Sequence, residues 1–396
     1  MTMFENIQTA PPDAILGLSE AFQADSHPEK INLSVGVYKD SAGKTPVLRC
    51  VKKAEYELVD NESTKGYLGI DGLPQYRQFV HQLVFGDAVD PRRAAIIQAP
   101  GGTGALRVAA DFIADQFGPA NIWLSNPTWA NHNSVFAAAR LGVQAYPYLN
   151  AGKTGLDFDA MIDTLDKKPR TGDVVLLHAC CHNPTGVDPS AEQWRQIAEV
   201  IKKRGLLPLI DFAYQGFGEG LDEDTIAVRT IAEVCDEMLV ASSFSKNFGL
   251  YSERVGALSL IAKDPANAEA GMSQLKRIVR TNYSNPPRHG AAIVATVINH
   301  PELRTLWHAE LAEMRDRIAA MRKAFVDGMH QRQNKQDFSF LLSQSGMFSF
   351  SGLNPMQVDQ LRNEYSIYIV GSGRINVAGM TEDNLPRLCD AVAAVL

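Results

Sequence analysis

Cysteine is scarce in this sequence, and its spacing fits no metal or disulfide framework. The chain holds five cysteines in 396 residues, an odd number with no Cys-x-x-Cys pair. Zinc ribbons need closely spaced cysteine pairs, and disulfide scaffolds need an even and dense set, so the sequence points to neither class. Cys180 and Cys181 are adjacent within an apolar stretch, which predicts small buried side chains. No spacing of His, Asp or Glu suggests a metal site either.

The chain also lacks an excess of positive charge and a long apolar run. It has 38 Lys and Arg against 45 Asp and Glu, for a formal net charge of −7. Nucleic acids and anionic membrane surfaces select basic proteins, so we expect neither partner. No segment approaches the ~18 consecutive apolar residues of a membrane-spanning helix. The first residues carry no basic segment followed by an apolar run, so we expect no signal peptide and a cytoplasmic protein.

What is present is a pattern of short apolar runs that alternate with amphipathic stretches. At roughly 100–200 residues per domain, the length predicts two domains. Ser190 and Gln193 form a capping-box pattern that predicts a helix through Lys203, ended by Gly205. Buried strands that alternate with helices are typical of a parallel α/β sheet. The predicted strands are residues 121–125, 174–178, 206–210, 238–241 and 255–260.

A different pattern follows at residues 301–329. Apolar residues recur there at spacings of three and four, from Leu303 to Met329, which predicts one face of a long helix that could connect two domains. After it, residues 338–340 and 347–350 alternate in polarity and predict strands of a smaller α/β unit. Residues 31–38 are also strand-like and could join that unit.

The residues just past the predicted strands carry the chemistry. In open α/β sheets, ligands bind beyond the carboxyl ends of the strands. These positions hold an aromatic ring, an amide, a carboxylate with a phenol, and a lysine, a set that suits a planar, phosphorylated carbonyl cofactor. Residues 100–106 add a glycine-rich turn that opens a helix and offers backbone N–H groups to a phosphate. The residues at the strand ends are Trp129, Asn183, Asp211, Tyr214 and Lys246.

These motifs resemble those of class I pyridoxal-phosphate-dependent aminotransferases, in the subgroup of aspartate and aromatic enzymes, and most closely its bacterial aspartate-type members. The lysine motif spans residues 243–256, and further matches lie at 182–186, 211–217, 283–287 and 372–376, in the family's order. The resemblance covers essentially the whole chain. It implies the type I fold of these transferases, an α/β fold whose large domain holds a mostly parallel sheet beside a smaller α/β domain. It places an N-terminal arm at 1–13, the large domain at 45–313, and the small domain at 14–44 and 314–396.

The resemblance also implies a role for each matched residue. Lys246 would bind the cofactor covalently and then carry a proton. Asp211 would pair with the pyridine nitrogen, Asn183 and Tyr214 would donate to the phenolate oxygen, and Trp129 would stack on the ring. His132 is expected either to support the site or to be merely structural. The phosphate would be held by Gly102, Thr103, Ser243, Ser245, Arg254 and, from a partner subunit, Tyr67.

For the substrate, the resemblance implies a dicarboxylic amino acid or 2-oxo acid. Arg374, assisted by Asn183, would bind the α-carboxylate, and Gly36 would let backbone approach. Arg280 would reach the distal carboxylate from the partner subunit, so the chain is expected to be a homodimer with shared sites. The resemblance thus favours amino transfer between L-aspartate and 2-oxoglutarate through pyridoxal 5'-phosphate. An aromatic aminotransferase is the alternative within the subgroup. Decarboxylation or β-elimination fits less well because Arg374 and Arg280 are both present, and a regulatory protein without activity fits less well because Lys246 and Asp211 are present.

Overall fold

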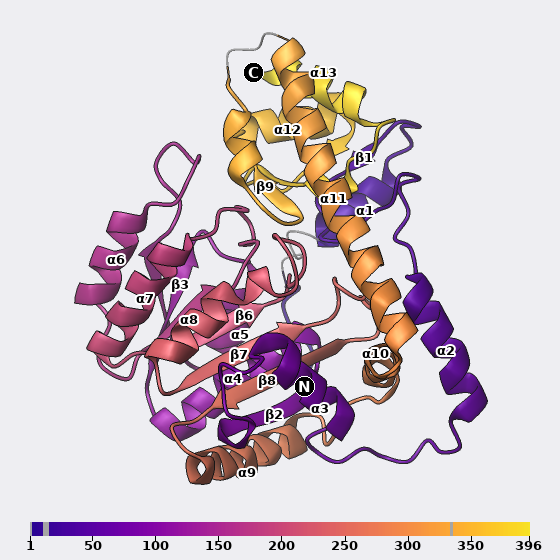
Figure 1. Cartoon of the computed structure of the whole chain (residues 1–396). Coiled ribbons are helices and arrows are strands. Elements are labelled where there is room, and N and C mark those ends of the chain that lie inside the picture. Colours follow the sequence, from indigo (N-terminus) through magenta and orange to yellow (C-terminus); the bar gives the residue numbers. More distant parts are fainter. Residues whose placement is uncertain (1, 11–15, 333–335) are drawn as a thin grey trace.

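A seven-stranded sheet lies at the centre of the larger part of the molecule (Figure 1). The computed structural model describes residues 2–10, 16–332 and 336–396. In spatial order the sheet contains β2 (Ala94–Pro100), β8 (Val255–Ile261), β7 (Met238–Ser243), β6 (Leu207–Phe212), β5 (Val174–His178), β3 (Asn121–Asn126) and β4 (Gly142–Pro147). The neighbours from β7 to β4 pair in parallel, whereas β8 is antiparallel to both β2 and β7. The predicted α/β class with a mostly parallel sheet is confirmed.

The reversed direction of β8 follows from the segment that leads into it. Residues 244–254, between β7 and β8, contain no helix. A parallel return needs a long crossover, usually a helix, so this short connection brings the chain back antiparallel. The same connection carries Lys246. Because the connection begins at the carboxyl end of β7, Lys246 lies near that edge of the sheet.

Helices cover both faces of the sheet because its buried strands are apolar on both sides. One core gathers around α4 (Gly101–Phe117), α5 (Asn131–Ala138) and α9 (Pro265–Asn282), and it includes Leu209 of β6. The opposite core includes Ile210, the next residue along that strand. The helices that contribute to this second core include α3 (Pro74–Val84), α6 (Phe158–Lys167), α7 (Ala191–Arg204) and α8 (Ile226–Val234). The capping box of Ser190 and Gln193 and the left-handed Gly205 bound α7 as predicted.

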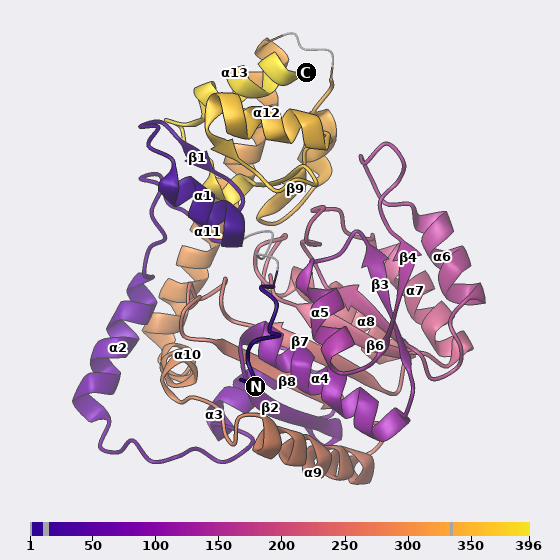
Figure 2. The ribbon, with the colours of Figure 1, turned by 180° about the vertical axis from the view of Figure 1, so that it is seen from behind.

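The smaller part contains two short sheets and the C-terminal helices (Figures 1 and 2). Its strands pair as β1 (Ile31–Asn32) with β10 (Ile367–Tyr368), and β9 (Phe348–Phe350) with β11 (Arg374–Asn376). The N-terminal segment thus joins the C-terminal unit, but only two residues of 31–38 form a strand. Its helices are α1 (Leu16–Ala24), α12 (Pro355–Tyr365) and α13 (Leu385–Val395).

The predicted strand at residues 338–340 is wrong. That stretch leads into the 3-10 helix η3 (Ser339–Ser343), where the side chain of Asp337 accepts hydrogen bonds from the backbone and hydroxyl of Ser339. A short local turn of this kind competes with the extended backbone that the alternating pattern suggested. The remaining 3-10 segments are η1 (Pro91–Arg93), η2 (Glu223–Thr225) and η4 (Val377–Gly379).

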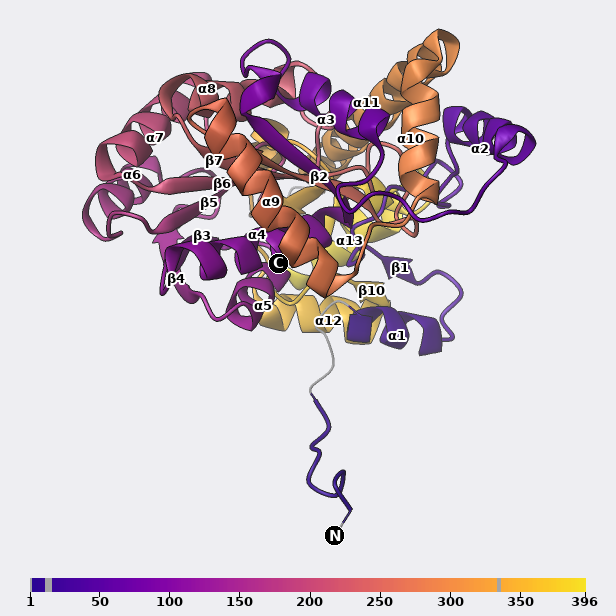
Figure 3. The same ribbon diagram turned by 90° about the horizontal axis from the view of Figure 1, so that it is seen from below.

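The long helix α11 (Pro301–Gln331) runs from the larger part to the smaller one (Figures 1 and 2), as its predicted apolar face indicated. Beside its first half lie α2 (Arg49–Asn61) and α10 (His289–Asn299). Residues 2–10 extend away from the body of the molecule (Figure 3), while residues 1 and 11–13 of the predicted arm lie outside the described residues. No described helix has the length and apolar character needed to cross a membrane.

Candidate active site

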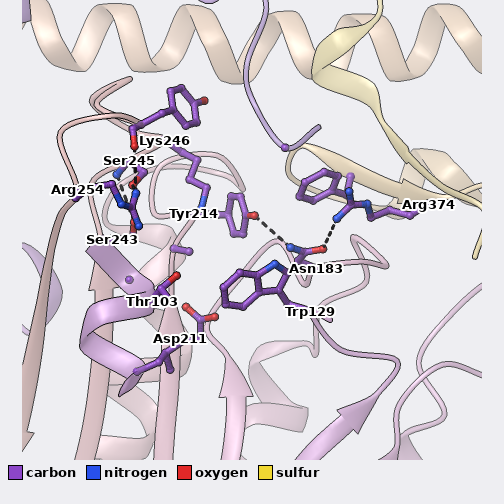
Figure 4. A pocket seen from close by; sticks show the side chains of 16 residues that line it. Thr103, Trp129, Asn183, Asp211, Tyr214, Ser243, Ser245, Lys246, Arg254 and Arg374 are labelled. Atoms are coloured by element: carbon purple, nitrogen blue, oxygen red, sulfur yellow. Dashed lines mark hydrogen bonds between the residues drawn. The ribbon is translucent and has the colours of Figure 1, made fainter. Parts of the chain in front are cut away.

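A cavity of about 260 Å³ lies at the carboxyl edge of the parallel strands, where the sequence predicted a site (Figure 4). Segments that follow β3, β5, β6 and β7 each contribute side chains to it, and the smaller part contributes others. Arg254 and Arg374 lie at opposite sides of the drawn pocket, with Lys246 and Tyr214 between them. The residues that line the cavity are Gly36, Gly102, Thr103, Leu106, Trp129, Asn183, Asp211, Ala213, Tyr214, Ser243, Ser245, Lys246, Tyr251, Arg254, Phe348 and Arg374.

One end of the cavity is built to receive an anion. Gly101 and Gly102 begin α4, so its free backbone N–H groups and the positive end of its dipole lie there. Gly101 has a φ of +75°, and a Cβ atom at this position would lie 2.4 Å from Nη2 of Arg254. Arg254 in turn donates from Nη1 to Oγ of Ser245 at 3.3 Å. Hydroxyls, a guanidinium and a helix N-terminus thus converge, which matches the needs of a phosphate group.

Lys246 lies at the centre of the cavity with its ammonium over an aromatic ring. Its Nζ atom is 4.8 Å from the centre of the Tyr214 ring. Desolvation lowers the pKa of Lys246 to about 8, with the positive charge of Arg254 acting in the same direction and the charge of Asp211 opposing it. A lysine with so low a pKa carries a neutral amine in an appreciable fraction of molecules near neutral pH. This is the form that attacks a carbonyl carbon.

Asp211, at the end of β6, is buried and is held by a histidine. Burial alone would raise the pKa of its carboxyl, but the hydrogen bond from His132 and the nearby charge of Lys246 outweigh it, and the pKa of Asp211 is lowered. Nε2 of His132 lies 3.0 Å from Oδ2 of Asp211, and Nδ1 lies 2.8 Å from Oγ1 of Thr128. Asp211 is therefore a fixed, ionised carboxylate at the floor of the cavity.

The other end of the cavity presents a guanidinium. Arg374 is only 5% exposed, and its described partners are neutral: Nη1 donates to Oδ1 of Asn183 at 3.4 Å and Nη2 donates to the backbone oxygen of Ser34. Its Nε is buried and finds no partner among the described residues. Desolvation lowers the pKa of Arg374 to about 10. A buried guanidinium with an unused donor is a ready site for a carboxylate.

Asn183 connects the two ends of the cavity. Its Nδ2 donates to the hydroxyl of Tyr214 at 3.4 Å, while its Oδ1 accepts from Arg374 (Figure 4). Burial and the charge of Asp211 raise the pKa of Tyr214, so its hydroxyl keeps its proton and can donate it in a hydrogen bond. Trp129 lines the same cavity and meets the His132 ring edge-on, with ring centres 5.1 Å apart.

The cavity fits pyridoxal phosphate on these observations. It combines an anion cradle that an added Cβ would fill, a lysine of lowered pKa, an ionised buried carboxylate and an indole. A cofactor with a phosphate, an aldehyde and a basic ring nitrogen needs this set of groups. No group of three or more His, Cys, Asp or Glu side chains suited to a metal ion occurs in the described part of the chain.

Most of the predicted site residues are brought together, and two are not. Every predicted cofactor and substrate residue lines the cavity except Tyr67, which is 95% exposed, and Arg280, which is exposed at the end of α9. Sequence reasoning missed Leu106, Ala213, Tyr251 and Phe348. Tyr251 lies inside the lysine motif and could have been found there. Phe348 could not, because only the fold of the smaller part brings β9 to the cavity.

Comparison with known proteins agrees with this geometry. The model of the family "Aminotransferase class I and II" matches residues 28–392. An aspartate aminotransferase of Escherichia coli is 54% identical over 100% of both chains. A crystal structure of an aromatic-amino-acid aminotransferase from Burkholderia pseudomallei, covalently bound to pyridoxal phosphate, has a TM-score of 0.97 and 50% identity over 100% of both chains. With the fold, the cavity and the full-length similarity in agreement, this chain belongs to the class I and II aminotransferase family.

Proposed function

We propose that this enzyme transfers an amino group between L-aspartate and 2-oxoglutarate, giving oxaloacetate and L-glutamate in a ping-pong cycle. The observation that carries amino transfer on an amino acid is the buried guanidinium of Arg374, which has neutral partners and an unused Nε, while the choice of aspartate rests on the relatives named below. Such a group selects a carboxylate, since an unpaired buried charge is costly. Several of the relatives with full-length similarity are named aspartate aminotransferases, which supports the same reaction.

Pyridoxal 5'-phosphate supplies, when bound, a ring that accepts electrons from the substrate's Cα–H bond. Arg254, Ser243, Ser245, Gly102 and Thr103 would hold its phosphate. Asp211 would keep the proton on the ring nitrogen, because its lowered pKa leaves the carboxylate ionised. Trp129 would cover the ring face, and Asn183 and Tyr214 would donate to the ring oxygen.

Lys246 has two tasks in this proposal. Its neutral amine would hold the cofactor covalently, and as a free amine it would accept and later release the proton of the substrate's Cα. Both tasks need an amine that changes protonation easily near neutral pH, and the pKa of Lys246, lowered to about 8 by desolvation, meets that need. Arg374 meanwhile holds the α-carboxylate, so the Cα–H bond is presented in one orientation.

The distal carboxylate requires a further cation, and the other cationic side chains that line the cavity, Lys246 and Arg254, are assigned to the cofactor. We assign this role to Arg280, and a phosphate contact to Tyr67, both acting from a partner subunit. The enzyme would then be a two-fold homodimer, in which each chain completes the other's site. Both side chains are exposed in the single chain, as a residue that serves a neighbouring site must be.

The surface of the chain supports a homodimer. Several large apolar side chains among the first 60 residues are exposed, and exposed apolar surface commonly marks a protein interface. Val47 is 62% exposed, and Tyr56 and Val59 on α2 are 65% and 76% exposed. Met3, Phe4 and Ile7, in the segment that leaves the body of the molecule in Figure 3, are also exposed.

The remaining assignments are proposals of the same kind. We infer an N-terminal arm at 1–13, a large domain at 45–313, and a small domain at 14–44 and 314–396. Residues 1, 11–15 and 333–335 of these ranges lie outside the described residues. We also propose a cytoplasmic location, and no nucleic-acid or membrane partner.

The decisive experiment is a side-by-side measurement of kcat/KM with aspartate, tyrosine and phenylalanine, each with 2-oxoglutarate as acceptor. We expect aspartate to be the preferred donor. A preference for tyrosine or phenylalanine would instead establish the aromatic alternative. Absence of amino transfer from all three donors by cofactor-loaded protein would reject the proposed function.

A further inference from the structure

The backbone segment 34–38 forms part of the cavity wall. Gly36 lines the cavity, and a Cβ atom at this position would lie 2.7 Å from Cζ of the Phe348 ring. The segment therefore packs directly on a side chain that itself lies 4.3 Å, by its ring centre, from the guanidinium carbon of Arg374. A shift of segment 34–38 would change the space next to the group that receives the substrate's α-carboxylate.

Several contacts tie this segment to the smaller part of the molecule. Nδ2 of Asn376 donates to the backbone oxygens of Val35 and Val37, at 2.7 and 2.8 Å. Arg374 donates to the backbone oxygen of Ser34. These donors are both in β11, so the segment and β11 form one unit with the carboxylate-binding guanidinium.

Two side chains of the larger part reach Tyr38 at the end of the same segment: Oγ1 of Thr45, close by in sequence, donates to its backbone oxygen at 3.0 Å, and the second comes from a distant part of the chain. The hydroxyl of Tyr251 accepts a hydrogen bond from the backbone N–H of Tyr38 at 2.9 Å, across 213 positions of sequence. Tyr251 lies in the 244–254 connection that carries Lys246, and it lines the cavity. Its backbone oxygen also accepts a hydrogen bond from Nη1 of Arg254 at 3.1 Å. Tyr251 thus contacts the anion cradle through its backbone and the wall segment through its side chain.

We propose that Tyr251 is a positioning residue for substrate: its hydroxyl fixes segment 34–38, and with it Gly36, against the lysine-bearing connection. This inference rests on the proposed function, in that Arg374 receives the substrate's carboxylate. The hydrogen bond joins the part that holds the substrate to the part that holds Lys246. Without this hydrogen bond the wall segment keeps its contacts with β11 and Thr45 but loses its link to the lysine-bearing connection, so the carboxylate site is less well ordered before substrate binds.

The test is Tyr251→Phe, which keeps the ring and removes only the hydroxyl. We expect the Tyr38 amide to exchange its hydrogen about tenfold faster or more, because it loses its acceptor. We expect KM for aspartate and the Kd of succinate, an unreactive dicarboxylate, to rise about three- to tenfold, while kcat changes less than twofold, as for a lost contribution to ground-state binding. Hydrogen exchange with mass spectrometry, steady-state kinetics and titration with succinate give the three readouts.

The matched control is Tyr146→Phe in β4. Tyr146 is buried, and its hydroxyl, like that of Tyr251, makes a hydrogen bond with the backbone, donating to the oxygen of Leu176 at 2.8 Å, but Tyr146 does not line the cavity. The control should show a comparable loss of thermal stability with KM, Kd and Tyr38 exchange unchanged. Wild-type values of KM and Kd in Tyr251→Phe would overturn the proposal, even if exchange at Tyr38 increased. Equal changes of KM and Kd in the two variants would show that Tyr251 has only a structural role, and this result would also overturn the proposal.

The proposal and the proposed function can fail separately. If the wild-type enzyme transfers no amino group from aspartate, the proposed function fails. Acetate, a monocarboxylate that needs only Arg374, then replaces succinate as the probe. A weaker Kd for acetate together with faster exchange at Tyr38 in Tyr251→Phe supports the positioning role. An unchanged Kd for acetate rejects it.

Discussion

The imidazole of His132 and the carboxylate of Asp211 are joined by a hydrogen bond of 3.0 Å at the floor of the cavity. Neither residue is free to turn. His132 is fully buried and its other ring nitrogen is held by Thr128, while Asp211 pairs in register with His178 of β5. Burial lowers the pKa of His178 to about 3, so this neighbouring ring is neutral. The hydrogen bond from His132 helps to keep Asp211 ionised in a site where burial would otherwise favour the protonated form.

This relationship predicts the behaviour of Asp211→Ala. The fold should be retained, since the side chain ends a strand and its main partner is one histidine. We expect kcat with aspartate to fall by about 10³-fold or more. The variant lacks the negative charge that would stabilise the protonated ring nitrogen of the cofactor. Asp211→Glu is the matched control, since it keeps the charge and should recover part of the rate. Near-normal turnover in cofactor-saturated Asp211→Ala would remove this carboxylate from the mechanism.

A second prediction concerns pH and Lys246. Desolvation in the cavity lowers the pKa of Lys246 to about 8, so the neutral amine accumulates as the pH rises through 8. The rate at which cofactor-free protein binds pyridoxal phosphate covalently should therefore rise with pH, with a midpoint near 8. Stopped-flow absorbance at several pH values measures this rate. Lys246→Ala should show no covalent binding, and a midpoint near 10 in the wild type would contradict the desolvated environment.

The third prediction concerns the carboxylate site. Arg374→Lys keeps one positive charge but loses the planar fork and its contact with Asn183. A hydrogen bond between charged groups contributes about 1.5–3 kcal/mol, so KM for aspartate should rise roughly 10- to 100-fold. Arg362→Lys, at an exposed ion pair with Asp359 on α12, is the control and should behave as wild type. An unchanged KM in Arg374→Lys would place the α-carboxylate elsewhere.

Much of the site could be predicted from the sequence because it depends on local patterns. A buried strand followed by a polar residue places that residue at the carboxyl edge of the sheet, and this sufficed for Asn183, Asp211 and Lys246. The capping box of α7 is local in the same sense. The direction of β8 was not predicted, since it depends on the absence of a helix in the preceding connection rather than on the strand's own residues.

Contacts between distant segments could not be predicted in this way. Phe348 reaches the cavity only because β9 pairs with β11, and the Tyr251 hydroxyl meets the backbone of Tyr38 across 213 positions. Nothing in either local sequence records the partner. The strand predicted from the alternating pattern at 338–340 is wrong because of a local contact. The side chain of Asp337 accepts hydrogen bonds from Ser339, and a turn forms there in place of a strand.

The last prediction concerns the proposed sharing of each site between two chains. If Arg280 serves the partner's cavity, each site combines Lys246, Asp211 and Arg374 of one chain with Arg280 of the other. Arg280→Asp should lower activity with aspartate by orders of magnitude and favour cationic amino acids relatively, because attraction to the distal carboxylate becomes repulsion. Arg277→Asp, one turn away on α9 and paired with Asp115, is the control for a charge reversal outside the site.

Hybrid dimers then test the geometry. A Lys246→Ala chain and an Arg280→Asp chain are each inactive alone, but their hybrid holds one site with both changes and one with neither. Purified hybrids, separated by two affinity tags, should recover about half the wild-type activity, since one of the two sites is intact. Hybrids with no recovered activity would show that Lys246 and Arg280 of one site come from the same chain. The single chain argues against that result, because its Arg280 is exposed and lies outside the residues that line the cavity.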